Sequence, residues 1–163
     1  LTMSNRVAVF DDGVIQQLAS PSVLYEKPEN AFVAQFIGEN NRLAGKVMKK
    51  NGPRCTVRID DGSLIQALAV NVGDVGQKTT LSLRPERVAI NPPEGEFPNI
   101  FEAKVEELIY LGDHIRTLVS VCNADEFIIK VPNAAGHAVL EEGRTTKVGW
   151  LAEDCRALDY IEN

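Results

Sequence analysis

Alternation of apolar and polar residues from Arg42 onward constrains the fold of this chain more than any other feature. In CTVRID (residues 55–60), every second side chain is apolar, and FEAKVEEL (residues 101–108) begins with the same period of two. A strand with one buried face has this pattern, because successive side chains point to opposite sides of a sheet. Turn signals follow these runs at Asp61-Gly62, Gly112-Asp113 and Glu142-Gly143. The pattern predicts a small antiparallel barrel or sandwich.

The first forty residues have a different pattern. RVAVF (residues 6–10) and VIQQL (residues 14–18) flank Asp12-Gly13, which predicts a hairpin. Ser20-Pro21 is typical of a helix start, and the short helix that follows should stop before Pro28. A second helix carries an apolar stripe and ends at Gly38, where a cap glycine is expected. This stripe needs a partner, which is either a missing preceding part of the protein or the β region that follows.

The pattern divides the chain into residues 1–40, with a hairpin and two short helices, and residues 41–163, with the β domain. Residues 90–99 (INPPEGEFPN) concentrate proline, glycine and asparagine, so we expect a loop there between two halves of the β region. The chain starts at Leu1 rather than methionine. We therefore expect it to be part of a longer protein.

Composition and motifs argue against several classes of function. The net charge is −6, and residues 101–163 hold six Lys/Arg against twelve Asp/Glu, so we expect no nucleic-acid partner. The three cysteines have no metal-binding or disulfide spacing and are expected to be reduced thiols. His114 and His137 lie in expected turns, and neither a metal motif nor a glycine-rich phosphate loop occurs. The sequence thus predicts no catalytic residue, no cofactor-binding residue and no metal ligand.

Two charged corners remain as candidate sites for a contact or for a small polar ligand. LRPERVAI (residues 83–90) places Arg84 and Glu86 around a proline that must interrupt a strand ladder. YLGDHIR (residues 110–116) places Asp113 and His114 at a turn between two apolar strands. Arginine suits a bidentate contact with a carboxylate. We therefore predict that Arg84 ties the two β halves together with Asp113 close by. The alternative is an Arg84 side chain that points into solvent.

A family resemblance covers nearly the whole chain. The segment from Arg6 to Asn41, RVAVFDDGVIQQLASPSVLYEKPENAFVAQFIGENN, resembles the end of the nucleotide-binding domain of bacterial ABC importer ATPases. LRPERVAI and YLGD resemble motifs of the C-terminal regulatory (TOBE) domain of these proteins. GWLAEDCRAL (residues 149–158) is similar to the ending that is typical of the polyamine (spermidine/putrescine) branch. Ala19 departs from the family, which usually has glycine there, and this affects only a turn.

The resemblance implies a mainly β fold, an OB-like antiparallel barrel domain of the TOBE/MOP type in two halves. It implies a regulatory and dimerisation domain in an importer for polyamines, at the inner face of the cell membrane. The partners implied are a second ATPase subunit and the membrane permease subunits. The family's phosphate loop, signature motif and switch histidine all precede the position of Leu1. The chain should therefore neither bind nor hydrolyse ATP, with ATP and Mg²⁺ held by the preceding part. The alternative is a module that binds a small oxyanion or cation in an importer for iron, sugar or molybdate.

Overall fold

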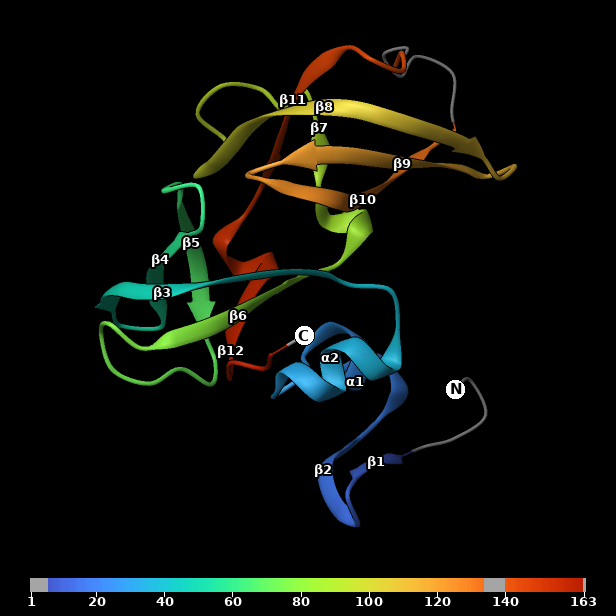
Figure 1. The fold of residues 1–163 in the computed structure, drawn as a ribbon. Coiled ribbons are helices and arrows are strands. Elements are labelled where there is room, and N and C mark those ends of the chain that lie inside the picture. The colour runs from blue at the N-terminus through green and yellow to red at the C-terminus, as the bar shows by residue number, and fades with distance from the viewer. Residues whose placement is uncertain (1–5, 134–139, 163) are drawn as a thin grey trace.

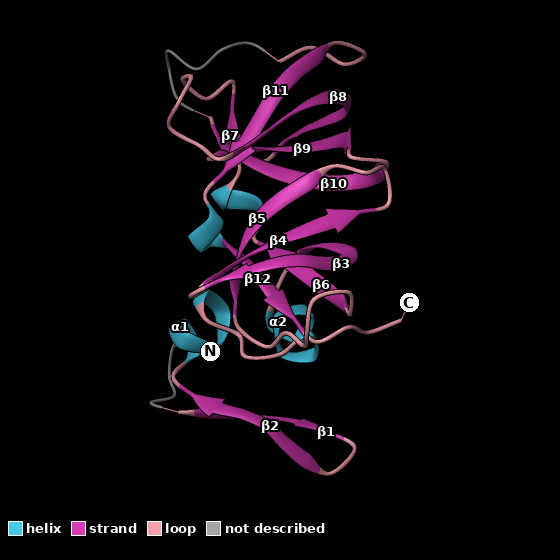
Figure 2. Cartoon of the chain, turned by 90° about the vertical axis from the view of Figure 1, so that its left-hand side faces the viewer, coloured by secondary structure: helices cyan, strands magenta, loops and turns pink. Residues whose placement is uncertain are grey.

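A computed structural model describes residues 6–133 and 140–162. Its parts are stacked along one axis, with a hairpin at one end, then two helices, a barrel and an open sheet (Figures 1 and 2). No described helix is long and apolar enough to cross a membrane. The mainly β architecture that the alternation predicts is confirmed.

The N-terminal elements follow the local signals in the sequence. The hairpin consists of β1 (Val7–Asp11) and β2 (Val14–Ala19), and it is followed by α1 (Pro21–Glu26) and α2 (Ala31–Ile37). Ser20 and Asn30 cap the two helices, because their side-chain oxygens accept hydrogen bonds from backbone N–H groups of the first turn. The predicted hairpin and helices are confirmed.

The apolar stripe of α2 packs partly on the β region, which is one of the two partners that the sequence left open, and partly on the hairpin and α1. Ala31 and Ala34 pack against Leu158 of the barrel, whereas Val33 packs against the hairpin and α1. Phe36 remains 65% exposed, and several apolar side chains of the hairpin are also exposed. The helices therefore pack on the β domain, and an apolar surface is still left open beside them.

The first β body is a closed barrel. Its strands are β3 (Asn41–Asn51), β4 (Arg54–Ile59), β5 (Leu64–Ala69), β6 (Lys78–Leu83) and β12 (Cys155–Leu158), in the order β12-β5-β4-β3-β6. All neighbours are antiparallel except β12 and β5, which pair in parallel and close the barrel.

The second β body is an open sheet in the order β10-β9-β8-β11-β7. Its strands are β7 (Ala89–Ile90), β8 (Asn99–Tyr110), β9 (His114–Val121), β10 (Ala124–Pro132) and β11 (Thr145–Trp150). Residues 91–98 form a loop, as predicted, but this loop joins β7 to β8 within the one sheet. The prediction that it separates the two halves is therefore wrong, because β7 pairs with β11 of the second body.

The two bodies are repeats of one unit. β3 pairs with β6 from Asn41–Leu83 to Lys46–Lys78, and β8 pairs with β11 from Asn99–Trp150 to Lys104–Thr145 in the same register. The next strand pairs, β3–β4 and β8–β9, each contain a register shift just after a buried valine, Val47 or Val105. Both valine carbonyl oxygens accept a hydrogen bond at 2.7 Å from a turn glycine with positive φ, Gly76 or Gly143. The residues of β3, β4 and β6 that these pairings include thus have structural equivalents in β8, β9 and β11.

The short strand that follows each body in the chain pairs with strands of the other body. β6 of the barrel leads through a short 3₁₀ turn, η1 (Pro85–Arg87), into β7, which joins the open sheet. β11 of the sheet leads through the matching turn η2 (Ala152–Asp154) into β12, which joins the barrel. One continuous core spans both bodies, and Trp150 lies in it with no exposed surface. This exchange means that neither body is complete without the other.

Candidate functional site

Arg84 lies at the end of β6, where the helices, the barrel and the open sheet meet. Its side chain is buried, with 5% of the residue exposed. Nη1 donates to the carbonyl oxygens of Ala34, Gly38 and Glu39 at 2.8, 3.1 and 3.0 Å, and Nε donates to the carbonyl of Tyr25 at 3.2 Å. The last carbonyls of a helix have no partner within it and attract a cation. The guanidinium therefore caps the end of α2 and holds both helices against the barrel.

Tyr25 of α1 covers the guanidinium of Arg84. The ring centroid lies 4.2 Å from Cζ of Arg84, and the Tyr25 hydroxyl donates to the two carboxylate oxygens of Glu86 at 2.5 and 2.8 Å. A Cβ at Gly38 would lie 3.0 Å from the same ring. Gly38 has an extended backbone, with φ of −175°, so close packing rather than a left-handed cap conformation favours glycine here. We name this set of residues (Tyr25, Gly38, Arg84 and Glu86) the Arg84 junction.

The electrostatics of the Arg84 junction reflect a charge removed from water. Burial lowers the pKa of the Arg84 guanidinium, and Tyr25, Glu86 and Glu26 oppose this effect. Burial and the hydrogen bond to Glu86 raise the pKa of Tyr25. Arg84 Nη2 is buried and has no hydrogen-bond partner within the described residues. Because the buried guanidinium binds four backbone carbonyl oxygens, it fixes the positions of α1 and of the end of α2 relative to β6.

The segment after α2 connects the Arg84 junction to the second body. The Glu39 carboxylate forms ion pairs with Arg116 of β9 and, at 3.5 Å, with Lys130 of β10. The Asn41 side chain exchanges two hydrogen bonds with the backbone of Ile128 on β10, at 2.7 and 2.8 Å. In the repeat, Asn99 does the same to Gln66 on β5, at 2.9 and 2.8 Å. These two asparagines tie each body to the other.

The predicted pairing of Arg84 with Asp113 is wrong. Arg84 binds backbone carbonyl oxygens of the helical segment, and Asp113 instead pairs with His114 at 2.8 Å on a turn where its side chain is 90% exposed. Hydrogen bonding to His114 lowers the pKa of Asp113. Arg84 therefore holds the helices against the barrel and does not tie the two β halves together. Glu86 lies at the junction through Tyr25, and Arg116 of the YLGDHIR stretch reaches Glu39. His137 lies outside the described residues.

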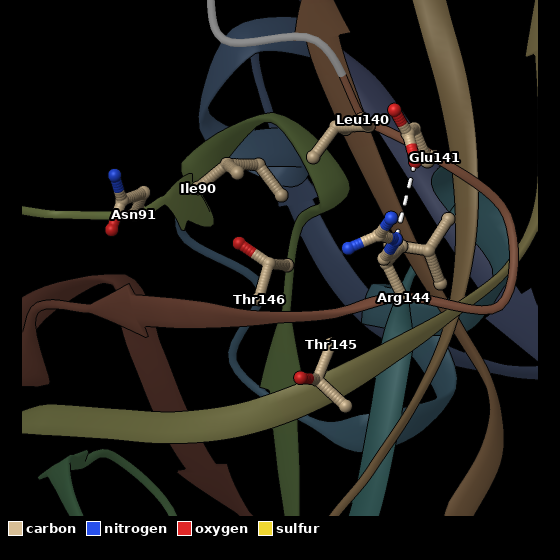
Figure 3. A pocket seen from close by; sticks show the side chains of 8 residues that line it. Ile90, Asn91, Leu140, Glu141, Arg144, Thr145 and Thr146 are labelled. Carbon is tan, nitrogen blue, oxygen red and sulfur yellow. Dashed lines mark ion pairs between the residues drawn. The ribbon is translucent and has the colours of Figure 1, made fainter.

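A hollow of about 310 Å³ lies on the second body (Figure 3). Its lining includes Ile90 and Thr146, and an ion pair joins Glu141 to Arg144 at 3.2 Å. Among the described residues that line the hollow, this exposed pair is the only set of titratable groups. Within the described residues, no group of three or more His, Cys, Asp or Glu side chains could hold a metal ion.

Comparison with known proteins places Arg84 and Glu86 of the Arg84 junction near the start of a recognised domain. Residues 81–158 match the TOBE domain family. The chain carries a TOBE domain. The match begins three residues before Arg84 and ends with β12, so it includes the junction arginine, the open sheet and the exchanged strands.

Whole-chain relatives extend this similarity beyond the TOBE domain. The chain is 35% identical over 160 residues to the spermidine/putrescine import ATP-binding protein PotA of Rubrobacter xylanophilus, covering 97% of the chain and 42% of the relative. It is 33% identical over 166 residues to the protein of that name from Trichodesmium erythraeum, covering 97% and 43%. The match is to the C-terminal region of these ATP-binding proteins. The chain thus spans less than half the length of the relatives it matches.

The fold of the TOBE domain also occurs in a solved structure. The cytoplasmic molybdate-binding protein ModG superimposes with a TM-score of 0.62 at 13% sequence identity, covering 74% of this chain and 96% of ModG. This similarity confirms the TOBE/MOP type of barrel that the resemblance implies. At this identity it concerns the fold alone.

Replacing Glu39 with glutamine is expected to lower the free energy of unfolding by about 1 kcal/mol at pH 7, because Glu39 is about one-third exposed and pairs with two cations. The hydrogen bond from Arg116 is the main cause that lowers the pKa of Glu39 below its ordinary 4.5. A lowered pKa contributes stability that is present above the unfolded-state value and is lost as the pH falls through the folded-state value. Urea unfolding of both proteins between pH 7 and pH 3 should show the difference shrinking below pH 4.5. A difference that stays constant down to pH 3 would exclude an ionic role for Glu39.

Proposed function

We propose that this chain is the regulatory and dimerisation part of the ATP-binding subunit of an ABC importer for polyamines. The observation that carries the proposal is the 35% identity with a spermidine/putrescine import ATP-binding protein over 97% of the chain. Residues 1–40 would be the end of the nucleotide-binding domain, and residues 41–163 the TOBE-type regulatory domain. The subunit would lie at the inner face of the cell membrane, on its permease subunits.

The Arg84 junction supports this proposal physically. In a longer subunit, α1 and α2 would belong to the ATPase part, and the β domain would follow. A buried guanidinium that binds carbonyl oxygens of both helical regions would transmit a displacement of the helices to the barrel, because a separate movement of the helices would break these hydrogen bonds. Glu39 and Asn41 extend this connection to the second body.

ATP and Mg²⁺ would be held by the preceding part of the subunit, so this chain would have no cofactor and no ATPase activity of its own. The direct test is a chimera of the Rubrobacter relative in which this chain replaces the matched region. We expect the chimera to restore ATP-dependent spermidine uptake in cells that lack the native subunit. A chimera that is expressed and assembles with the permease, but supports no uptake, would contradict the proposal.

The chain alone is expected to dimerise through its β domain. Like charges that face each other oppose association, so the acidic second body should lie away from the contact or pair with cations across it. Sedimentation velocity over a range of concentrations should then show a monomer–dimer equilibrium that weakens as the net negative charge is increased. A monomer at the highest concentration would exclude dimerisation by the chain alone but would leave the transport role open.

A second candidate function is the binding of a small ligand by the β domain. The shared fold with ModG, a molybdate-binding protein, supports an oxyanion, whereas the acidic second body favours a cation. Titration calorimetry with molybdate and with spermidine distinguishes these possibilities. Heat of binding from either ligand would favour the ligand-binding function, and heat from neither would leave the regulatory and dimerisation role.

A further inference from the structure

Three cationic side chains stand in one row across the outer face of the barrel. Lys46 of β3 lies directly opposite Arg58 of β4 on one side and Lys78 of β6 on the other. All three residues are exposed. Neighbouring strands are about 4.8 Å apart, and like charges directly opposite each other on one face of a sheet are destabilising. We name this set of three residues the basic row.

The basic row lines a hollow of about 510 Å³. Met48 and Asp60 also line it, and Tyr160 of the C-terminal segment closes one side, with Lys78 Nζ 5.0 Å from its ring centroid. Among the described residues of the lining, Asp60 supplies the one carboxylate, which leaves these residues with a net charge of +2. Its volume is in the range of sites that bind small molecules.

The second body provides an internal control for the basic row. In the second body, the residues equivalent to Arg58, Lys46 and Lys78 are Ser120, Lys104 and Thr145, respectively. At the position of Met48 stands Glu106, which lies 4.0 Å from Lys104 and accepts a hydrogen bond from Ser120 at 3.2 Å. Thr145 lines the hollow of Figure 3. The same strands thus form with a single lysine and its counter-charge, so the fold does not require three cations.

The charge of the basic row has no such compensation. None of the ion pairs among the described residues includes Lys46, Arg58 or Lys78. The imbalance extends to the bodies: residues 41–90 hold nine Lys/Arg and four Asp/Glu, whereas residues 91–154 hold five and twelve. The basic row therefore lies in the part of the chain that carries the positive charge, and three neighbouring cations attract anions to their face of the barrel.

We propose that the basic row binds a small polyanion that carries two or more phosphate groups, such as pyrophosphate or a longer phosphate chain. Lysine and arginine are the side chains that bind phosphate oxygens, through charge-assisted hydrogen bonds. The row extends over two strand spacings, about 10 Å, so a single phosphate can meet only part of it whereas a chain of phosphates can meet all three cations. Binding there depends on charge and would not make the chain an ATPase.

Calorimetric titration of the 163-residue chain with phosphate, pyrophosphate and tripolyphosphate tests the proposal. We expect affinity to rise with the number of phosphate groups and to fall as salt is added, because exposed charges are screened. Lys46→Gln should weaken pyrophosphate binding about tenfold, the effect of removing one charge-assisted hydrogen bond. The matched control, Lys104→Gln in the second body, should bind as the wild type does.

Met48→Glu gives an independent test, because it places in the barrel the counter-charge that Glu106 supplies in the sheet. We expect this variant to lose pyrophosphate binding and to melt at a higher temperature than the wild type in the absence of ligand. Equal losses in the Lys46 and Lys104 variants, or no binding by the wild type, would overturn the proposal. The proposal would also be overturned if the wild type binds no pyrophosphate but self-associates, and if Lys46→Gln abolishes this self-association. The basic row would then be a contact with a second copy of the chain. The family membership and the transport role do not depend on any of these outcomes.

Discussion

Replacing Arg84 with alanine is expected to lower the free energy of unfolding by about 3 kcal/mol, since each buried carbonyl left without a partner costs about 1–3 kcal/mol and water restores some of these bonds. The carbonyl oxygens concerned belong to Tyr25, Ala34, Gly38 and Glu39. Denaturant unfolding followed by circular dichroism measures the change. The loss should appear with no change in the folded-state spectrum beyond the two short helices.

Two further variants near Arg84 test whether the loss of stability comes from the guanidinium group. Arg87→Ala removes an exposed ion pair with Glu26, which should change the free energy of unfolding by less than about 1 kcal/mol. Arg84→Lys keeps the charge but loses the planar fork of donors, so it should recover only part of the stability. If Arg84→Ala is as stable as Arg87→Ala, the guanidinium does not hold the helices, and the Arg84 junction is not the tie described above.

Replacing Asn99 with alanine should lower the free energy of unfolding by about 2–3 kcal/mol, because its removal leaves buried backbone groups unpaired. Asn99 is 1% exposed, binds both polar backbone groups of Gln66, and donates at 3.3 Å to the carbonyl of Trp150. Urea unfolding measures the loss, and the sole tryptophan, Trp150, should report it by fluorescence.

The repeat supplies the matched comparison for Asn99. Asn41→Ala breaks the equivalent pair of bonds to Ile128 and should cost nearly as much, whereas Asn51→Ala, at an exposed end of β3, should change stability little. If Asn51→Ala lowers the free energy of unfolding as much as Asn99→Ala does, the destabilisation does not come from the hydrogen bonds between the two bodies. It would then result from replacing any asparagine with alanine.

Local structure was readable from the sequence where a local cause determines it. The period of two predicted the strands because each has one buried face, as the burial of Cys55, Val57 and Ile59 shows. Ser20 and Asn30 cap their helices through bonds to residues only three positions away. Each of these causes acts within a few residues, which is the range over which a sequence pattern carries information.

The contacts that build the candidate site act over longer range. Arg84 was expected to find a carboxylate, but its acceptors are backbone carbonyls, and these have no signature in the sequence. The parallel pairing of β12 with β5 joins residues far apart in the chain, such as Leu68 and Arg156, and no turn signal marks it. The composition of residues 91–98 predicts a break in the chain but not which strands the loop connects. The repeat has no clear sequence signal because equivalent positions differ in chemistry, as Arg84 and Leu151 do before the two matching turns.

Native-state hydrogen exchange tests most directly whether the helices, the barrel and the sheet form one unit. The exchanged strands and the paired asparagines predict that the amides of β4 in the barrel and of β9 in the sheet open together, with the same free energy and the same dependence on denaturant. Arg84→Ala should lower both values equally while it opens α2 first. If the amides of β9 stay protected under conditions in which those of β4 already exchange, the two bodies unfold independently, and the chain is not the single coupled module described here.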